Sequence, residues 1–334
     1  FWLSFWLLII MKKNLTLLFS VLIMVSCQTK KGTPLVLSSN GNINTITVVM
    51  PNQLWQGTIG QTVRDMYSYP AEGLPQQEPL YDLKQIPPEI FTGFAQSSRS
   101  VLWIGISDHT SVRIDKNTYA QPQTIAVFTA PTTERLTEII ISQTNKVIET
   151  IRKQERIEKL RRIRKSTYTN HELEEKFGIS LTMPSAYNTF KEGENTVWFQ
   201  REIQKGHVNL LVLTTPYDET IVTHKNLEQI IAKRDSVGKA FIPGRLPNSY
   251  LITEKAYEPY VYHTSFGNKP AVEIRGTWEV QGDFMAGPFL QYIINDKANN
   301  RNIVLEGFVF APSTAKRDYI FEVETILRSI KEKK

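Results

Sequence analysis

The chain contains a single cysteine, Cys27, and the residues before it give that thiol a specific chemistry. Two lysines at 12–13 precede an apolar run over residues 15–25, and the small Ser26 stands directly before the cysteine. A positive start, a short apolar stretch and a small residue at the cleavage point are typical of a signal peptide. Residues 24–27 (MVSC) predict a lipobox, at which diacylglycerol is transferred to the thiol, the chain is cleaved, and the new amine is acylated. The alternative is an ordinary secretory signal followed by an unrelated cysteine.

The segments on either side of this signal predict where the protein resides. Residues 1–10 precede the first methionine and carry no charge. We expect a misassigned start and a signal peptide ending at residue 26; the rival is a membrane helix interrupted by the lysines. Residues 27–42 predict an acylated, flexible tether. Surface-exported lipoproteins of Bacteroidetes resemble one another in an acidic cluster after the cysteine, but here no acid occurs before Asp65. We therefore expect a periplasm-facing anchor in the inner or outer membrane rather than the cell surface.

Composition excludes several classes of protein. The net charge is only +6 at pH 7, which is no footprint of a nucleic-acid-binding protein. With its one thiol acylated, the mature chain has no cysteine for a disulfide, for thiol catalysis or for a metal. No further run of about 18 apolar residues predicts another membrane span.

Motifs of catalysis are absent or incomplete. Fingerprints of nucleotide binding, zinc hydrolases and nucleophile elbows do not occur, and the five histidines are isolated. Ser236 and Lys239 match Ser-x-x-Lys of penicillin-recognising enzymes without its companion elements. Asp218 and Glu219 fit a solvated turn better than acid–base work. We expect no catalytic residue, metal or cofactor. The alternative is an envelope hydrolase assembled from scattered residues, which a perturbed carboxylate or histidine in a deep cleft would favour.

Residues 69–79 are the strongest candidate for binding in the first half. Three prolines and one glycine exclude a helix and predict a preorganised loop, which lowers the entropic cost of binding. The candidate binding residues are Trp55, Gly73, Leu74, Pro75, Gln76, Glu78 and Pro79. The alternative is a rigid structural connection. A second candidate is an aromatic run of Tyr250, Tyr257, Tyr260, Tyr262 and Phe266, whose rings would stack on a sugar or peptide, or merely cover a sheet.

The first domain is expected over residues 43–165. Patterning predicts strands at 44–50, 81–86, 100–106, 111–117 and 124–129, and helices near 52–66 and 89–95. A long helix follows over residues 132–165, and eight of its last fourteen residues are Lys or Arg. Its basic end includes Arg161, Arg162 and Arg164. The simpler expectation is a solvated helix leading into a linker; the alternative is contact with anionic lipid headgroups or an acidic partner.

The second domain is expected over residues 166–334. Alternating apolar residues predict antiparallel strands at 196–203, 208–215, 261–264, 271–280, 284–295 and 302–311. Helices are predicted at 170–177, 226–237 and 314–331. This order is similar to that of the PsbP-like (Mog1-type) α/β/α sandwich. The resemblance implies binding or assembly rather than catalysis, although fold analogy is weak ground for function.

Short segments of the first domain carry a second resemblance. The strand NTITVVM at 44–50, LWQG at 54–57 and GLPQ at 73–76 resemble an uncharacterised Bacteroidetes lipoprotein family, of the domain of unknown function 4837 type. The match is expected over the whole mature chain. The family usually shows Arg-Asn where this chain has Arg99 and Ser100. The resemblance implies location and length, and no activity.

These observations predict an α+β protein: two α/β sandwich-like domains with mixed or antiparallel sheets, and the long basic helix between them. The expected function is that of a membrane-anchored envelope lipoprotein of unknown biochemical activity, a binding or scaffold component. Its expected partners are the membrane, through the lipid on Cys27, and an unknown envelope protein or glycan, with no nucleic acid.

Overall fold

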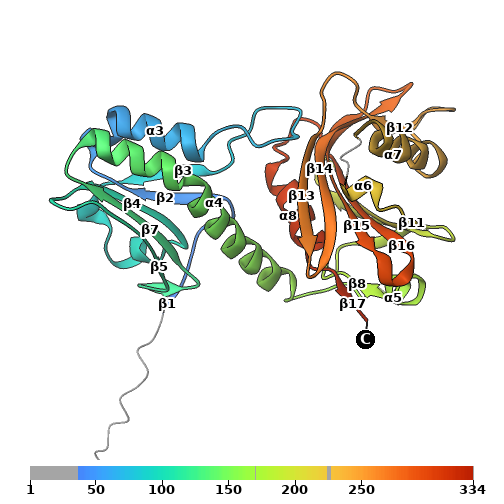
Figure 1. Ribbon diagram of the computed structural model, residues 1–334, viewed down its shortest axis with the longest axis horizontal. Coiled ribbons are helices and arrows are strands. Elements are labelled where there is room, and N and C mark those ends of the chain that lie inside the picture. The colour runs from blue at the N-terminus through green and yellow to red at the C-terminus, as the bar shows by residue number, and fades with distance from the viewer. Residues whose placement is uncertain (1–36, 170, 224–226, 334) are drawn as a thin grey trace, which may run out of the picture. The chain divides into compact units, whose positions relative to one another are not determined.

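A computed structural model describes residues 37–169, 171–223 and 227–333. Cys27 and the signal peptide lie outside the described residues. Ser38–Lys334 form one compact unit. Within it, an N-terminal half (residues 38–165) and a C-terminal half (residues 166–333) each contain a sheet covered by helices (Figure 1).

The N-terminal half is built on a five-stranded mixed sheet with the order β3-β2-β4-β7-β5. Its strands are β2 (Thr45–Val49), β3 (Asp82–Ile86), β4 (Ser100–Ile106), β5 (Ser111–Lys116) and β7 (Thr124–Ala130). β5 alone runs antiparallel to its neighbour in this sheet. β7 is buried along almost its whole length, as its continuous apolar sequence requires. The short strands β1 (Leu37–Ser38) and β6 (Ala120–Gln121) lie outside this sheet.

Two of the helix predictions in this half differ from the structure. The helix expected near 52–66 is divided into α2 (Asn52–Gln56) and α3 (Thr58–Tyr67), because Gly57 is extended. At Gly60 a Cβ would lie 1.9 Å from the carbonyl oxygen of Trp55, so only glycine permits this sharp turn. The helix expected at 89–95 is two 3-10 turns, η1 (Pro88–Ile90) and η2 (Gly93–Ser97).

The long helix α4 (Thr133–Ile163) connects the halves. Its N-terminus is capped by the Thr132 side chain, which accepts a hydrogen bond from the Arg135 backbone N–H. From its start to Ile151 it buries an apolar stripe against α3 and the sheet (Figure 1). Beyond Ile151 the helix contacts α8 (Arg317–Leu327) of the C-terminal half.

The C-terminal half is an eight-stranded antiparallel sheet with the order β12-β14-β15-β16-β11-β10-β9, and β13 also pairs with β14. Its strands are β9 (Asn188–Glu192), β10 (Thr196–Ile203), β11 (Gly206–Pro216), β12 (Tyr250–Thr253), β13 (Tyr260–Phe266), β14 (Lys269–Gln281), β15 (Ala286–Asp296) and β16 (Arg301–Phe310). Outside it lie α5 (His171–Phe177), β8 (Ile179–Ser180), α6 (Thr220–Thr223), η3 (Lys297–Asn299) and β17 (Lys331–Glu332).

Helices cover both faces of this sheet. α8 packs on the face that carries Leu290 and Leu305, and α7 (Leu227–Phe241) packs on the face that carries Phe289 and Val304. The final helix is shorter than the predicted 314–331, because the chain leaves it after Leu327 and β17 pairs with β8. The chain is therefore an α+β protein with two sandwich-like halves. No helix in the described ranges is both long and apolar enough to cross a bilayer.

Candidate functional site

The predicted binding loop, residues 69–79, is held closed by its own backbone. Leu80 N donates to Tyr69 O at 2.8 Å, and Ala71 N donates to Glu78 O at 2.8 Å. The loop therefore has a fixed shape, as its prolines predict. Its tip, which includes Pro75 and Gln76, is exposed.

The loop lies directly against β14. Gly73 has a φ of +75°, and a Cβ at this position would lie 3.0 Å from the backbone nitrogen of Gly276. The next residue, Leu74, packs against the core of the C-terminal half. Glycine is thus required at 73 both by the backbone conformation and by the close approach of β14.

Glu78 caps a helix of the other half. Its carboxylate accepts hydrogen bonds from the backbone N–H groups of Lys316, at 2.7 Å, and Arg317, at 2.8 Å, where α8 begins. The Arg317 side chain donates in return to the carbonyl oxygen of Pro79 at 2.9 Å. Glu78 and Pro79 therefore fasten the loop to α8 and are not free to contact a ligand through these atoms.

A cavity of about 240 Å³ opens beside the loop and is lined by both halves. We call it the tyrosine–arginine pocket. Its polar wall includes Tyr69, Glu72, Arg152, Tyr262, Glu273 and Arg275. Its apolar wall includes Leu74, Ile320 and Phe321. Such a mixture of aromatic, apolar and charged groups is suited to a small polar ligand with an apolar face.

Two tyrosines give the pocket its hydrogen-bonding edge. Tyr262 Oη donates to a carboxylate oxygen of Glu72 at 2.6 Å. Burial, together with this hydrogen bond, raises the pKa of Tyr262 above its usual value. Burial, followed by the charge of Glu72, raises the pKa of Tyr69 as well. Both phenols therefore stay protonated at neutral pH; the proton of Tyr262 is donated to Glu72, and Tyr69 can donate to a ligand.

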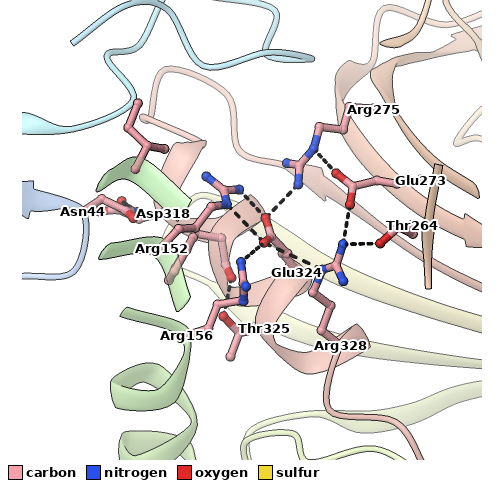
Figure 2. A network of polar contacts seen from close by, with 12 residues as sticks. Asn44, Arg152, Arg156, Thr264, Glu273, Arg275, Asp318, Glu324, Thr325 and Arg328 are labelled. Atoms are coloured by element: carbon pink, nitrogen blue, oxygen red, sulfur yellow. Dashed lines mark hydrogen bonds and ion pairs between the residues drawn. The ribbon is translucent and has the colours of Figure 1, made fainter. Parts of the chain in front are cut away.

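Behind the pocket lies a network of arginines and glutamates, centred on Glu324 (Figure 2). Glu324 accepts hydrogen bonds from Arg156 at 3.0 Å and from Arg275 at 2.7 Å, and it also pairs with Arg152. On β14, Glu273 pairs with Arg275 at 2.6 Å; a further pair joins Glu273 to Arg328 at 2.7 Å. The four arginines of this network outnumber its two carboxylates.

The arginines keep both carboxylates ionised. Burial opposes ionisation of Glu324, but the charges of Arg152 and Arg275 outweigh it and hold the pKa of that carboxyl well below its usual range. Burial is likewise outweighed at Glu273, where Arg275 is the largest favourable charge and the pKa is lowered. A carboxylate with a lowered pKa does not hold a proton at neutral pH, so neither group suits a general acid.

The structure separates some of the predicted residues and joins others. Trp55 is not among the residues that line the pocket; it packs in the N-terminal core, and the Arg64 guanidinium lies 4.7 Å from its ring centre. In contrast, Tyr262 of the aromatic run meets Glu72 of the loop, 190 residues away in sequence. The two binding candidates therefore meet in the pocket through few of their predicted residues: Leu74 is the one predicted binding residue of the loop in its lining, and Tyr262 is the one residue of the aromatic run.

The arginine–glutamate network was not predicted from the sequence, although one signal was present. Glu324 stands among Ile320, Val323 and Leu327 on the apolar stripe of the last helix. A carboxylate at such a position must be paired when buried. Its partners could not be identified, because Arg152 and Arg275 lie 172 and 49 residues away.

The basic end of α4 is partly neutralised. Arg161 and Arg162 both donate to Glu158 at 2.7 Å, and Arg162 also donates to the carbonyl oxygen of Gly41 at 3.1 Å. Within the described part of the chain, the exposed Arg164 side chain has no hydrogen bond or ion pair. Of the three predicted arginines, Arg161 and Arg162 therefore have part of their donors occupied, whereas Arg164 could direct its whole guanidinium at an anion.

The remaining chemical candidates lie on the surface. Ser236 and Lys239 are exposed on α7. Hydrogen bonds from Lys233 and Thr220 lower the pKa of Asp218. Among the described residues, no group of three or more His, Cys, Asp and Glu side chains is arranged to hold a metal ion.

Two family models match the chain. Residues 166–329 match the family described as "Domain of unknown function (DUF4837)". Residues 39–164 match "Domain of unknown function (DUF8532)". The expected DUF4837 family is thereby confirmed for residues 166–329 and not for the whole mature chain. The segments at 44–50, 54–57 and 73–76, which carried the resemblance, lie in the DUF8532 match. No curated protein matches the chain.

Solved structures show distant similarity. The chain is similar to the Saccharomyces cerevisiae Ran-binding protein Mog1p, with 8% identity, a TM-score of 0.32, and coverage of 47% of this chain and 90% of that one. A mutant of protein Mog1 has 7% identity, a TM-score of 0.29, and coverage of 46% and 90%. Human STARD10 has 8% identity, a TM-score of 0.24, and coverage of 48% and 78%.

Proposed function

We propose a lipid-anchored binding protein of the bacterial cell envelope. The chain matches the DUF4837 family model over residues 166–329 and the DUF8532 family model over residues 39–164. The anchor is the acylated Cys27 on the periplasmic face of a membrane. The binding site is the tyrosine–arginine pocket, and its ligand is a glycan of the envelope.

The sequence around Cys27 supports the anchor. The sole cysteine follows a charged start, an apolar run and a small residue in the order that acylation requires. Two or three acyl chains hold a protein stably at a membrane, whereas one chain gives only reversible binding. The tether after Cys27 carries lysines and no acid, which favours the periplasmic face over the cell surface.

The pocket carries the proposal of glycan binding. Its volume of about 240 Å³ is slightly below the roughly 300–1,000 Å³ of most ligand pockets, so its ligand is a small unit such as a single sugar. Tyr69 and Tyr262 offer rings and hydroxyl groups, while Glu72 and Arg152 offer an acceptor and a donor for sugar hydroxyls. Both halves contribute to its walls, so a bound sugar would contact residues of the N-terminal half and of the C-terminal half.

A hydrolase is the second candidate, because Glu72 and Glu273 line the same pocket. Glycoside hydrolysis needs one carboxyl that holds a proton and one that does not. The pKa of Glu273 is lowered, and its oxygens are occupied by Arg275 and Arg328. Binding is therefore the better supported function.

Metabolic labelling with an alkyne analogue of palmitate tests the anchor. The unaltered chain is expected to incorporate the label and to sediment with membranes. Cys27→Ala is expected to lose both properties. Equal labelling of the two chains would reject the anchor while leaving the pocket untouched.

Titration with envelope glycan fragments tests the pocket separately. The probe would be soluble muropeptides and lipopolysaccharide core oligosaccharides, added to the full chain carrying Cys27→Ala. Tyr262→Ala is expected to weaken binding by about tenfold, as loss of an aromatic contact in a ligand site does. Tyr257→Ala is the matched control, because Tyr257 belongs to the same aromatic run and is 68% exposed. Equal affinities of the two variants would reject the pocket, and release of cleaved sugar would favour the hydrolase.

A further inference from the structure

A second cavity lies on the other side of the arginine–glutamate network. Its volume is about 570 Å³, within the range of roughly 300–1,000 Å³ that ligand sites occupy. Its walls come from α4, the turn between β13 and β14, and the end of α8. We call it the α4 groove.

The floor of the α4 groove is apolar. It includes Ile157, Leu160, Phe266, Ile294 and Ile330. Ile157 is 51% exposed although it lies on a helix beside a packed domain. Phe266 is fixed in place, because its ring packs edge-on against Tyr292 with a centroid distance of 5.1 Å. An aliphatic surface left open inside a groove is typical of a site for an apolar ligand.

The rim of the α4 groove is cationic. Lys153, Arg156, Lys269 and Arg328 line it, against the single carboxylate of Glu332. That carboxylate is already paired with Lys269. Lys269 also pairs with Asp296, and Arg328 pairs with Glu273. The attraction for an anion therefore comes from Lys153 and Arg156.

Two of these cations have donors left for a ligand. Of the hydrogen bonds and ion pairs formed among the described residues, none involves the Lys153 side chain, which is exposed. Arg156 uses its Nη1 for Glu324 at 3.0 Å, so the other N–H groups of its guanidinium are available. Lys153 and Arg156 belong to the same stretch of α4 as Ile157, so the charges stand directly beside the apolar floor.

We propose that the α4 groove binds a single-chain anionic amphiphile, namely a long-chain fatty acid. Its hydrocarbon chain lies along Ile157, Leu160 and Phe266, and its carboxylate is held by Lys153 and Arg156. A neutral lipid would leave Lys153 without a counter-charge, and a soluble sugar would leave the apolar floor uncovered. This inference does not depend on the glycan proposal, because the two cavities share no lining residue.

Fluorescence titration with dansyl-undecanoic acid tests the proposal. The full chain carrying Cys27→Ala is used, so that no covalent acyl chain competes. The structure predicts saturable binding with a blue-shifted emission, displaced by lauric acid and not by lauryl alcohol. Ile157→Glu is expected to abolish binding, and Lys153→Glu is expected to weaken it by about tenfold, because the attraction to the ligand carboxylate becomes a repulsion.

Matched variants distinguish the groove from the rest of the surface. Ile141 lies on the same helix with the same exposure of 51% but outside the groove, so Ile141→Glu is expected to bind like the unaltered chain. Lys205→Glu, in the exposed turn between β10 and β11, is the control for charge. Equal loss in Ile141→Glu and Ile157→Glu, equal displacement by acid and alcohol, or binding of an acidic peptide in place of the fatty acid would overturn the proposal.

Discussion

Arg156 and Glu324 lie 168 residues apart in the sequence, and their side chains meet at 3.0 Å between α4 and α8. The Glu324 carboxylate is only 2% exposed, and Arg152 and Arg275 approach it as well. A buried carboxylate with three cationic partners connects the N-terminal half to the C-terminal half. We infer that this network, together with the cap provided by Glu78, makes the two halves one compact unit.

Glu324→Gln is expected to destabilise the protein by about 3–5 kcal/mol, because it leaves buried arginines without their counter-charge. Urea unfolding followed by circular dichroism measures the change. Glu138→Gln removes an exposed ion pair with Arg135 and is expected to change the free energy of unfolding by less than about 0.5 kcal/mol. Equal effects of the two substitutions would contradict a structural role for the network.

The lowered pKa of Glu158 makes the stability of the fold depend on pH. Burial opposes its ionisation, but hydrogen bonds from Arg161 and Arg162 outweigh this and lower its pKa to about 2. The unfolded value is about 4.3. A lowered pKa stabilises the fold above the unfolded pKa, and this stabilisation is lost as the pH falls through the folded pKa. The difference in stability between the unaltered chain and Glu158→Gln is therefore expected to shrink between about pH 4.3 and pH 2. A constant difference across this range would show that the ion pairs contribute nothing.

Gly73→Ala is expected to cost about 2–4 kcal/mol, through left-handed strain and the approach of β14 within 3.0 Å. Gly93→Ala is the matched control, because Gly93 also has a positive φ but has no atom within 4 Å of an added Cβ. Its cost is expected to be about 1 kcal/mol. Thermal unfolding compares the two, and a smaller loss for Gly73→Ala than for Gly93→Ala would mean that the loop does not press on β14.

Glu78→Gln is expected to lower stability by about 1–2 kcal/mol, because an amide provides a weaker, uncharged acceptor for the N–H groups of Lys316 and Arg317. Hydrogen exchange is expected to rise in the first turn of α8. Glu89→Gln, at an exposed position of η1, serves as the control. No change in exchange at α8 would contradict the cap.

Charge reversal on the basic end of α4 tests membrane contact. Each basic residue near an anionic leaflet contributes about 1 kcal/mol. Arg164→Glu is expected to reduce flotation with phosphatidylglycerol vesicles more than Arg161→Glu does, because Arg161 is already paired with Glu158. Binding of the Cys27→Ala chain should also fall as salt is added. Unchanged flotation after reversal of Arg161, Arg162 and Arg164 together would leave α4 as a solvated helix.

Local sequence patterns predicted most helices and strands. Contacts between residues that are far apart in the sequence could not be predicted. The alternation in β14 and the apolar stripe of α8 are properties of a few adjacent residues, so they could be interpreted correctly. The rigid loop at 69–79 was also predicted from its prolines. In contrast, the partner of Glu78 lies 238 residues away, and the partner of Glu72 lies 190 residues away. Only the folded chain shows that Glu78 is a helix cap and that Tyr262 shares a pocket with Glu72.

Photo-crosslinking in cells tests the central claim most directly, since it uses the acylated protein at its own location. p-Benzoylphenylalanine would replace Tyr262 in the tyrosine–arginine pocket and, in a control chain, the exposed Tyr257. We predict that irradiation attaches a carbohydrate to the chain altered at 262, identified by sugar fragment ions in mass spectrometry, and none at 257. Absence of a carbohydrate adduct at 262, or the same adduct at both positions, would contradict a glycan-binding pocket.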